Sequence, residues 1–280
     1  MIEEARKFDQ LIYTEDEQKV LRVWKTNRNR IVKILTSNYI ILTVFYFVVV
    51  LFTKDKLLPF KLIFKPNTIF TPWYEVAYIL ELVFFMCGMS AMIATDTLCV
   101  TFICQTCMHL KIVEVMLKNC DKNNKGIIAI IKKHVEILEY GRDVCGELST
   151  SILCQYITMF FITCFATFTC QLTTIPAMRN KMIWVSLMIY FLFLITCVAG
   201  ELVTSISENI AISLAQSKFV SYDEKEETRD INNMIVFIIM RAQQPLKLKV
   251  GTYGRINLQF YTSTFKNIYS VIMLLKTVYN

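Results

Sequence analysis

Long apolar stretches separated by shorter polar segments dominate this sequence. Five of them reach or approach the roughly 20 residues that a helix needs to cross a hydrocarbon core of about 30 Å. They cover residues 34–53, 74–102, 151–174, 182–203 and 256–275. The pattern predicts an all-α integral membrane protein with five transmembrane helices.

Several of these helices are expected to continue beyond the bilayer on one side. From Ile127 to Leu148 apolar residues recur at helical spacing, and the pattern runs without proline into the third span. A helix from Ile127 to Thr174 would measure on the order of 70 Å, over twice the bilayer core. Residues 103–150 and 204–250 are therefore predicted to form a cytoplasmic helical layer. Helices lying on the lipid surface are the alternative.

Basic residues indicate the orientation of the chain. Alternate segments outside the spans total 21 Lys and Arg against 7, and the richer set includes residues 1–33. Cytoplasmic loops carry the excess of basic residues in membrane proteins. The N-terminus is therefore predicted to be cytoplasmic and the C-terminus extracellular. The net charge of +7 is mostly explained by these orienting basic residues, so nucleic-acid binding is not expected.

Composition agrees with a membrane setting and argues against an enzyme. The chain is 55% hydrophobic, with a mean hydropathy of +0.45. Its two histidines, His109 and His134, lie in no HExxH context, and no GxSxG or phosphate-binding loop occurs. Cys104 and Cys107 form a single CxxC without a second pair, which favours packing over metal binding. Neither catalytic residues, a metal nor a cofactor is expected.

The last apolar stretch, 256–275, differs from the others because it holds Lys266 and Asn267 near its middle. A helix that served only as an anchor would not carry a cation and an amide there. This helix is expected to face water or other protein, which makes a conduit the first hypothesis. Before it, residues 231–240 are apolar but too short to cross, and Pro245 breaks the helical pattern. They are predicted to form a short buried helix followed by a bend.

The C-terminal residues resemble the last-helix signature of the insect odorant receptor family. RAQQPLKLKVG, Arg241 to Gly251, precedes an F-T-S-x-x-K-x-x-Y-S arrangement. That arrangement is represented by Tyr261, Thr262, Ser263, Lys266, Tyr269 and Ser270. ATDTL (94–98), HVEILEY (134–140) and Gly200-Glu201 extend the resemblance upstream. The similarity covers nearly the whole chain as the third to seventh helices of a seven-helix fold, with the first two helices lacking.

This resemblance implies an odorant-gated, non-selective cation channel in the plasma membrane of olfactory sensory neurons. Family members act as tetramers of a ligand-tuning subunit with a shared co-receptor. The implied partners are that co-receptor, a small volatile hydrophobic ligand and membrane lipid. The whole chain, 1–280, would then form one receptor-like transmembrane domain. The alternatives are a gustatory-receptor-like ligand-gated channel and a non-functional truncated receptor fragment.

The resemblance also implies positions for the gate and the ligand pocket. The hydrophobic constriction near the outer end of the family's last helix corresponds to Leu274, followed by Thr277 and Val278. Volatile ligands are small and apolar, so the pocket is expected to be aromatic and Met-lined, in the outer halves of the helices. The candidates are Tyr46, Phe47, Phe84, Phe85, Phe161, Phe165, Trp184 and Met188.

Overall fold

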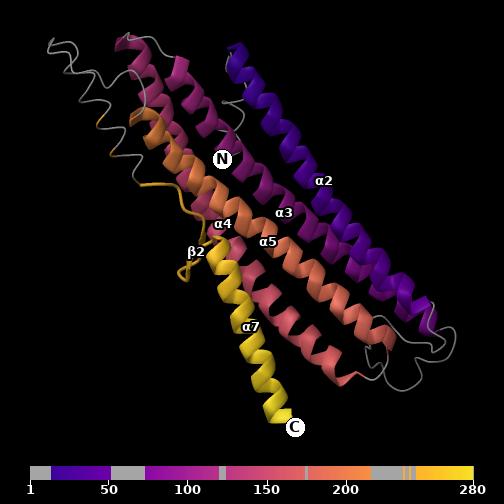
Figure 1. The fold of residues 1–280 in the computed structure, drawn as a ribbon. Helices are drawn as coiled ribbons and strands as arrows, with labels where there is room; N and C mark the ends of the chain where they lie inside the picture. Colours follow the sequence, from indigo (N-terminus) through magenta and orange to yellow (C-terminus); the bar gives the residue numbers. More distant parts are fainter. Residues whose placement is uncertain are drawn as a thin grey trace. The chain divides into compact units, whose positions relative to one another are not determined.

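The computed structural model describes residues 14–51, 73–119, 124–173, 176–215, 236, 240 and 244–279. The long helices in these ranges are α2 (Glu15–Leu51), α3 (Trp73–Asn119), α4 (Asn124–Leu172), α5 (Pro176–Ala215) and α7 (Leu258–Tyr279) (Figure 1). Before α7, β1 (Lys249–Val250) and β2 (Gly254–Arg255) form an antiparallel hairpin. The mostly helical class is confirmed. The short helix predicted at 231–240 lies largely outside the described residues.

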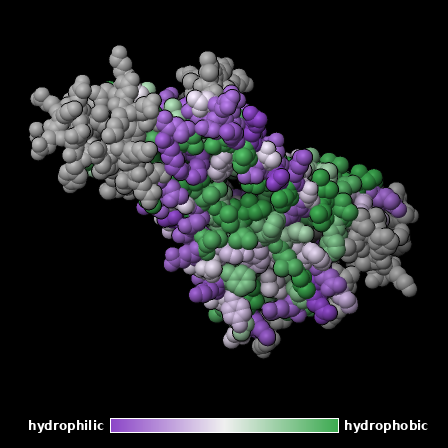
Figure 2. Space-filling model, turned by 45° about the horizontal axis from the view of Figure 1, so that its top comes forward, coloured by the Kyte–Doolittle hydropathy of each residue, from purple (hydrophilic) through white to green (hydrophobic). Residues whose placement is uncertain are grey.

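Helices α3, α4 and α5 are each long and apolar enough to cross a membrane. They contain the predicted spans 74–102, 151–174 (up to Leu172) and 182–203. Helix α4 has 49 residues and is about 74 Å long, so its length exceeds that of the hydrocarbon core, as predicted. Large hydrophobic side chains are exposed along these helices, and apolar areas are visible on the surface (Figure 2). Three candidate spans occur in the part of the chain that the structure describes; the spans predicted in α2 and α7 are not among them and remain predictions.

The chain packs as two compact units, and the division crosses every long helix. Unit 1 comprises Met1–Arg30, Cys99–Tyr156 and Ile195–Tyr261. Unit 2 comprises Ile31–Leu98, Ile157–Leu194 and Thr262–Asn280. Unit 1 therefore holds most of the sequence predicted to be cytoplasmic, and unit 2 holds most of the predicted membrane spans.

The core of unit 1 is made by apolar residues at helical spacing on α3, α4 and α5. Side chains with no or almost no exposed area come from all three helices. They include Leu110, Ile112 and Val113 of α3, Ile137 and Leu138 of α4, and Ile206 and Ile210 of α5. Burial of these side chains, and not only helix propensity, stabilises helices of this length.

Between Gln244 and Val250 the chain is extended, and burial alternates along it. Leu246, Leu248 and Val250 are buried, whereas Lys247 and Lys249 are exposed. This period of two is that of an extended strand with one face against the core. We call residues 244–257, from this strand to the start of α7, the docking segment.

Polar contacts fix the docking segment to α5 within unit 1. The backbone N–H of Leu246 donates to Ser207 Oγ at 3.2 Å. Thr204 Oγ1 donates to the carbonyl oxygen of Leu246 at 3.0 Å. Both hydroxyl groups are buried, so loss of either would leave a backbone group of Leu246 unpaired.

Two glycines allow the docking segment to approach the helices closely. A Cβ atom on Gly141 of α4 would lie 2.5 Å from Leu246 Cδ1, and one on Gly200 of α5 would lie 2.6 Å from the carbonyl oxygen of Ile256.

In the hairpin, Gly251 has a φ of 51° and its N–H donates to Ser149 O at 3.4 Å. Arg255 and Glu201 form an ion pair beside Gly200, at 3.6 Å. The segment that leads into α7 is thus held from both sides.

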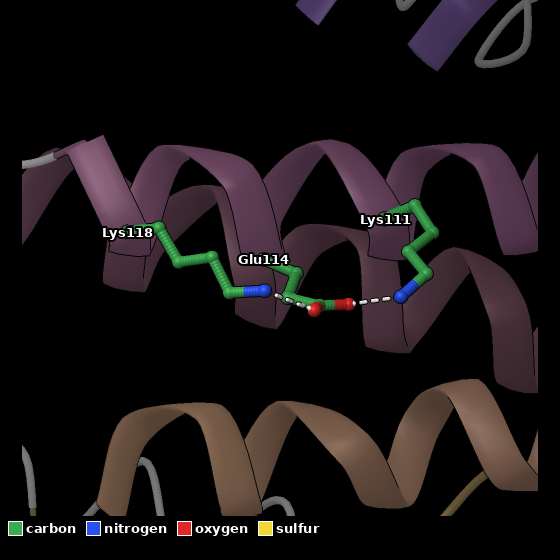
Figure 3. Close-up of polar contacts among 3 residues, drawn as sticks. All are labelled: Lys111, Glu114 and Lys118. Atoms are coloured by element: carbon green, nitrogen blue, oxygen red, sulfur yellow. Dashed lines mark hydrogen bonds and ion pairs between the residues drawn. The ribbon is translucent and has the colours of Figure 1, made fainter. Parts of the chain in front are cut away.

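A charge cluster lies near the C-terminal end of α3. Glu114 pairs with Lys111 at 2.5 Å and with Lys118 at 2.8 Å, one turn away on either side (Figure 3). Burial raises the pKa of the Glu114 carboxyl, but the hydrogen bonds and charges of the two lysines outweigh it, and the net pKa is lowered.

Replacing Gly200 with Ala should destabilise the protein by about 1–3 kcal/mol, because the added methyl group meets the backbone of Ile256. Gly146→Ala is the matched control, since its Cβ would meet nothing within 4 Å on helix α4. Alanine favours a helix over glycine, so this control should be neutral or stabilising by up to about 1 kcal/mol. Thermal unfolding of the detergent-purified variants measures both, and equal effects would contradict the close contact.

Glu114→Gln should lower stability by about 1 kcal/mol at neutral pH. A lowered pKa in the folded protein contributes stability above the ordinary range of a Glu side chain, and this contribution is lost as pH falls through the lowered pKa. Unfolding free energies of the two proteins, measured from pH 7 to pH 3, should therefore converge at the acidic end. A difference that does not change with pH would contradict the pairing.

Candidate functional site

Helix α7 starts at a side-chain cap. Asn257 Oδ1 accepts a hydrogen bond from the backbone N–H of Phe260 at 2.7 Å, which satisfies a donor at the helix N-terminus. Within unit 1, the Phe260 ring contacts Tyr156 of α4, with centroids 5.3 Å apart. The beginning of α7 is thus continuous with the docking segment and fixed by it.

The remainder of α7 is attached to unit 2 along a narrow stripe. Thr264, Ile268 and Ile272 are buried and follow one another at intervals of four residues, which places them on one face of the helix. Beside this stripe, Phe265 contacts Tyr190 of α5, with ring centroids 5.3 Å apart. Most other side chains of α7 are exposed.

The face opposite the buried stripe is mainly polar. At 3.6 residues per turn, the spacing of four and three places six exposed residues along it. These residues, which we call the polar stripe, are Gln259, Ser263, Lys266, Ser270, Met273 and Thr277. Ser270 Oγ donates to Lys266 O at 3.0 Å, and Thr277 Oγ1 donates to Met273 O at 2.9 Å. Each hydroxyl proton is satisfied by the helix itself, while the hydroxyl oxygen can still accept hydrogen bonds from water.

The predicted gate residues lie in the last two turns of α7. Leu274 is 63% exposed and Val278 is 79% exposed, and Thr277 is also exposed. By helix geometry, Thr277 belongs to the polar stripe, Leu274 borders it, and Val278 lies farther around. The structure thus leaves all three available for contact outside this chain.

The predicted ligand residues are only partly brought together. In unit 2, Phe47 of α2 is buried and contacts Phe85 and Tyr78 of α3, with ring centroids 5.2 Å and 5.9 Å apart. Tyr78 Oη also donates to Phe47 O at 3.4 Å. Phe47 and Phe85 therefore belong to one aromatic cluster.

Most other ligand candidates lie on the surface. Phe84 is 76% exposed, and Phe161 and Phe165 are similarly exposed. Trp184 is also exposed, and its ring contacts Phe45 at 5.7 Å between centroids. Met188 is half-buried, and the Tyr46 side chain lies outside the described residues. Among these ligand candidates, Phe85 is the one that a described ring contact places against Phe47.

The structure also reveals residues that the sequence reasoning overlooked. Tyr78 completes the aromatic cluster, and it precedes Phe85 by seven residues, a spacing that shares a helix face. In the same unit, Glu81 of α3 and Lys181 of α5 are both buried, and their opposite charges attract. The sequence does draw attention to Glu81, because an acidic residue inside an apolar run is rare in a membrane helix and usually has a specific role.

No cluster of three or more His, Cys, Asp or Glu side chains able to hold a metal occurs within the described ranges. The cysteines in those ranges are all free thiols, including Cys104 and Cys107. In unit 2, Asp96 is buried and accepts a hydrogen bond from Tyr39 Oη, which fits a structural role for this carboxylate.

Comparison with known proteins identifies related sequences and folds. The family model described as 7tm Odorant receptor matches residues 4–269. The chain is 25% identical to Odorant receptor 67c of Drosophila melanogaster over an alignment of 197 residues that covers 68% of this chain and 47% of that protein. It is 27% identical to Odorant receptor 10 of Aedes albopictus over an alignment of 225 residues that covers 75% of this chain and 57% of that protein.

Solved structures share the fold. The olfactory receptor OR5 from Machilis hrabei in complex with eugenol aligns with a TM-score of 0.75 at 18% identity, covering 93% of this chain and 70% of that one. A second structure of the same receptor aligns with a TM-score of 0.72 at 16% identity, covering 93% of this chain and 68% of that one. The chain spans about half the length of the curated relatives that it matches.

Phe47→Ala should destabilise the protein by about 3 kcal/mol, because it removes a buried ring from the aromatic cluster. Phe84→Ala is the matched control on α3, and its exposed ring predicts a change within about 0.5 kcal/mol. Thermal unfolding in one detergent compares the two variants. Equal losses would show that Phe47 is no more buried than Phe84.

Proposed function

The chain belongs to the 7tm odorant receptor family, and on that premise we propose that it is the ligand-tuning subunit of a heteromeric, odorant-gated, non-selective cation channel. Its partner is the family's co-receptor subunit in a heterotetramer. The assembly acts in the plasma membrane of olfactory sensory neurons, with residues 1–33 in the cytoplasm. The observation that carries this proposal is the polar stripe of α7.

Exposing the polar side chains of this stripe to lipid would cost free energy, whereas water or protein can satisfy them. A Lys at the centre of a membrane helix costs about 2.5–3.5 kcal/mol on insertion scales, and Lys266 lies in such a helix together with Ser263 and Ser270. Within its own chain, α7 is buried along the stripe of Thr264, Ile268 and Ile272, on the face opposite Lys266. The exposed face therefore supports a path shared with neighbouring subunits, to which each subunit contributes one α7 helix.

Leu274 is the proposed gate, with Thr277 and Val278 beside it. A ring of apolar side chains can close a pore by excluding water, and small displacements reopen it. Leu274 borders the polar stripe near the end of α7, which supports this assignment. The Lys266 ammonium would repel cations in a narrow path, so we place it reaching toward a neighbouring subunit.

The proposed ligand site is apolar and lies within unit 2, where Phe47 and Phe85 meet. The other proposed contacts remain Tyr46, Phe84, Phe161, Phe165, Trp184 and Met188. A solved structure of similar fold is a complex with eugenol, which supports a small-molecule site. A ligand opens the channel by binding the open state more tightly, and about 1.4 kcal/mol of preference changes the ratio of states tenfold.

Thiol accessibility along α7 tests the shared path. The channel is expressed with its co-receptor after replacement of the exposed Cys87 and Cys154 by Ser. Cysteine at Ser263, Ser270 or Thr277 should react with a charged thiol reagent and change the odorant-evoked current. Cysteine at Thr264, Ile268 or Ile272 should not, because these positions are buried. Equal reactivity on both faces, or none on the polar stripe, would refute the proposal.

Leu274→Ala should raise the odorant-independent current roughly tenfold, because a smaller apolar side chain admits water to the constriction. Leu275→Ala is the matched control, since the next residue points about 100° away around the helix. Its basal current should equal that of the unmodified protein when surface expression is equal. Matching increases in both variants would argue against Leu274 as the gate.

A further inference from the structure

One face of α2 carries an exposed basic surface. At 3.6 residues per turn, five exposed polar residues fall within an arc of about 100°. They are Arg22, Thr26, Asn29, Arg30 and Lys33. The sequence holds no acidic residue between Gln18 and Leu51, so this part of α2 has no carboxylate of its own to pair with these basic side chains.

The charges on this face are not compensated by other described side chains. Several basic residues elsewhere in the structure pair with carboxylates: Lys111 and Lys118 with Glu114, Lys19 with Asp16, and Arg255 with Glu201. In contrast, no hydrogen bond or ion pair within the described ranges involves the side chains of Arg22, Arg30 or Lys33. Among the described side chains, none therefore neutralises this basic face.

The same face changes character where the proposed membrane span begins. Lys33 directly precedes Ile34, and the next residues on the arc are mostly apolar, with Ile40 and Val44 exposed. Arg30 lies about 6 Å before Ile34 along the helix axis, within the thickness of a headgroup layer, and Arg22 lies about 18 Å before it. Arg30 and Lys33 thus lie at headgroup level, whereas Arg22 lies beyond it.

We propose that Arg30 and Lys33, with the Asn29 amide beside them, bind the headgroup of an anionic phospholipid in the inner leaflet. Arginine and lysine donate charge-assisted hydrogen bonds to phosphate, and each basic side chain near a membrane surface strengthens anionic-lipid binding about fivefold. This proposal rests on the membrane placement of α2 and not on conduction by the channel.

The test measures the affinity of the detergent-purified full chain for fluorescent phosphatidylserine and phosphatidylcholine. The unmodified protein should prefer phosphatidylserine, and the Arg30→Gln/Lys33→Gln variant should lose about 25-fold in phosphatidylserine affinity. Arg22→Gln is the matched control on the same face, and it should change the affinity less than twofold. The charge-preserving Arg30→Lys/Lys33→Arg variant should retain binding, which separates loss of charge from loss of fold.

Competitors distinguish the source of the anion. Neither inorganic phosphate nor a poly-glutamate peptide at equal concentration should displace phosphatidylserine. Displacement by either would assign the surface to a soluble anion or an acidic protein segment and overturn the lipid proposal. Equal losses in the Arg22→Gln and Arg30→Gln/Lys33→Gln variants would also overturn it. Because the readout is lipid affinity, this result is independent of whether the protein conducts.

Discussion

The attachment of the docking segment to α4 and α5 is the constraint on which the arrangement of α7 depends. Helix α7 is buried along a single stripe, Thr264, Ile268 and Ile272, so its own contacts hold it on one side only. The position of its first residues is set instead by Leu246 and Ile256. These two residues are buried against Gly141 and Gly200, where any larger side chain would clash with them. The face of α7 opposite the buried stripe is exposed and mainly polar.

Much of this fold follows from periodicity in the sequence. The continuous helical pattern from Ile127 predicts a helix longer than the bilayer, and α4 is such a helix. What the pattern does not reveal is the close packing at Gly141 and Gly200. A glycine inside a helical run predicts only a weaker helix, and its role appears only when a distant segment is placed against it.

The sequence predicts the two parts of the candidate site, α7 and the aromatic cluster, to different extents. Lys266 and Asn267 interrupt an apolar run, so the unusual character of α7 is visible in the sequence. The aromatic cluster is harder to predict, because the part of α3 around Phe85 is apolar on most of its circumference, so helical periodicity does not single out one face. Phe84 and Phe85 are adjacent and chemically identical, yet Phe84 is exposed while Phe85 contacts Phe47. Only packing across helices decides between them.

In the channel that we propose, α7 borders water on one face. Spin labels introduced one at a time from residue 259 to residue 277, in channels reconstituted with the co-receptor, test it most directly. Collision with a water-soluble nickel chelate should peak at residues 259, 263, 266, 270, 273 and 277, with the period of an α-helix. Accessibility to oxygen alone around the whole helix, as for a helix surrounded by lipid, would contradict the account.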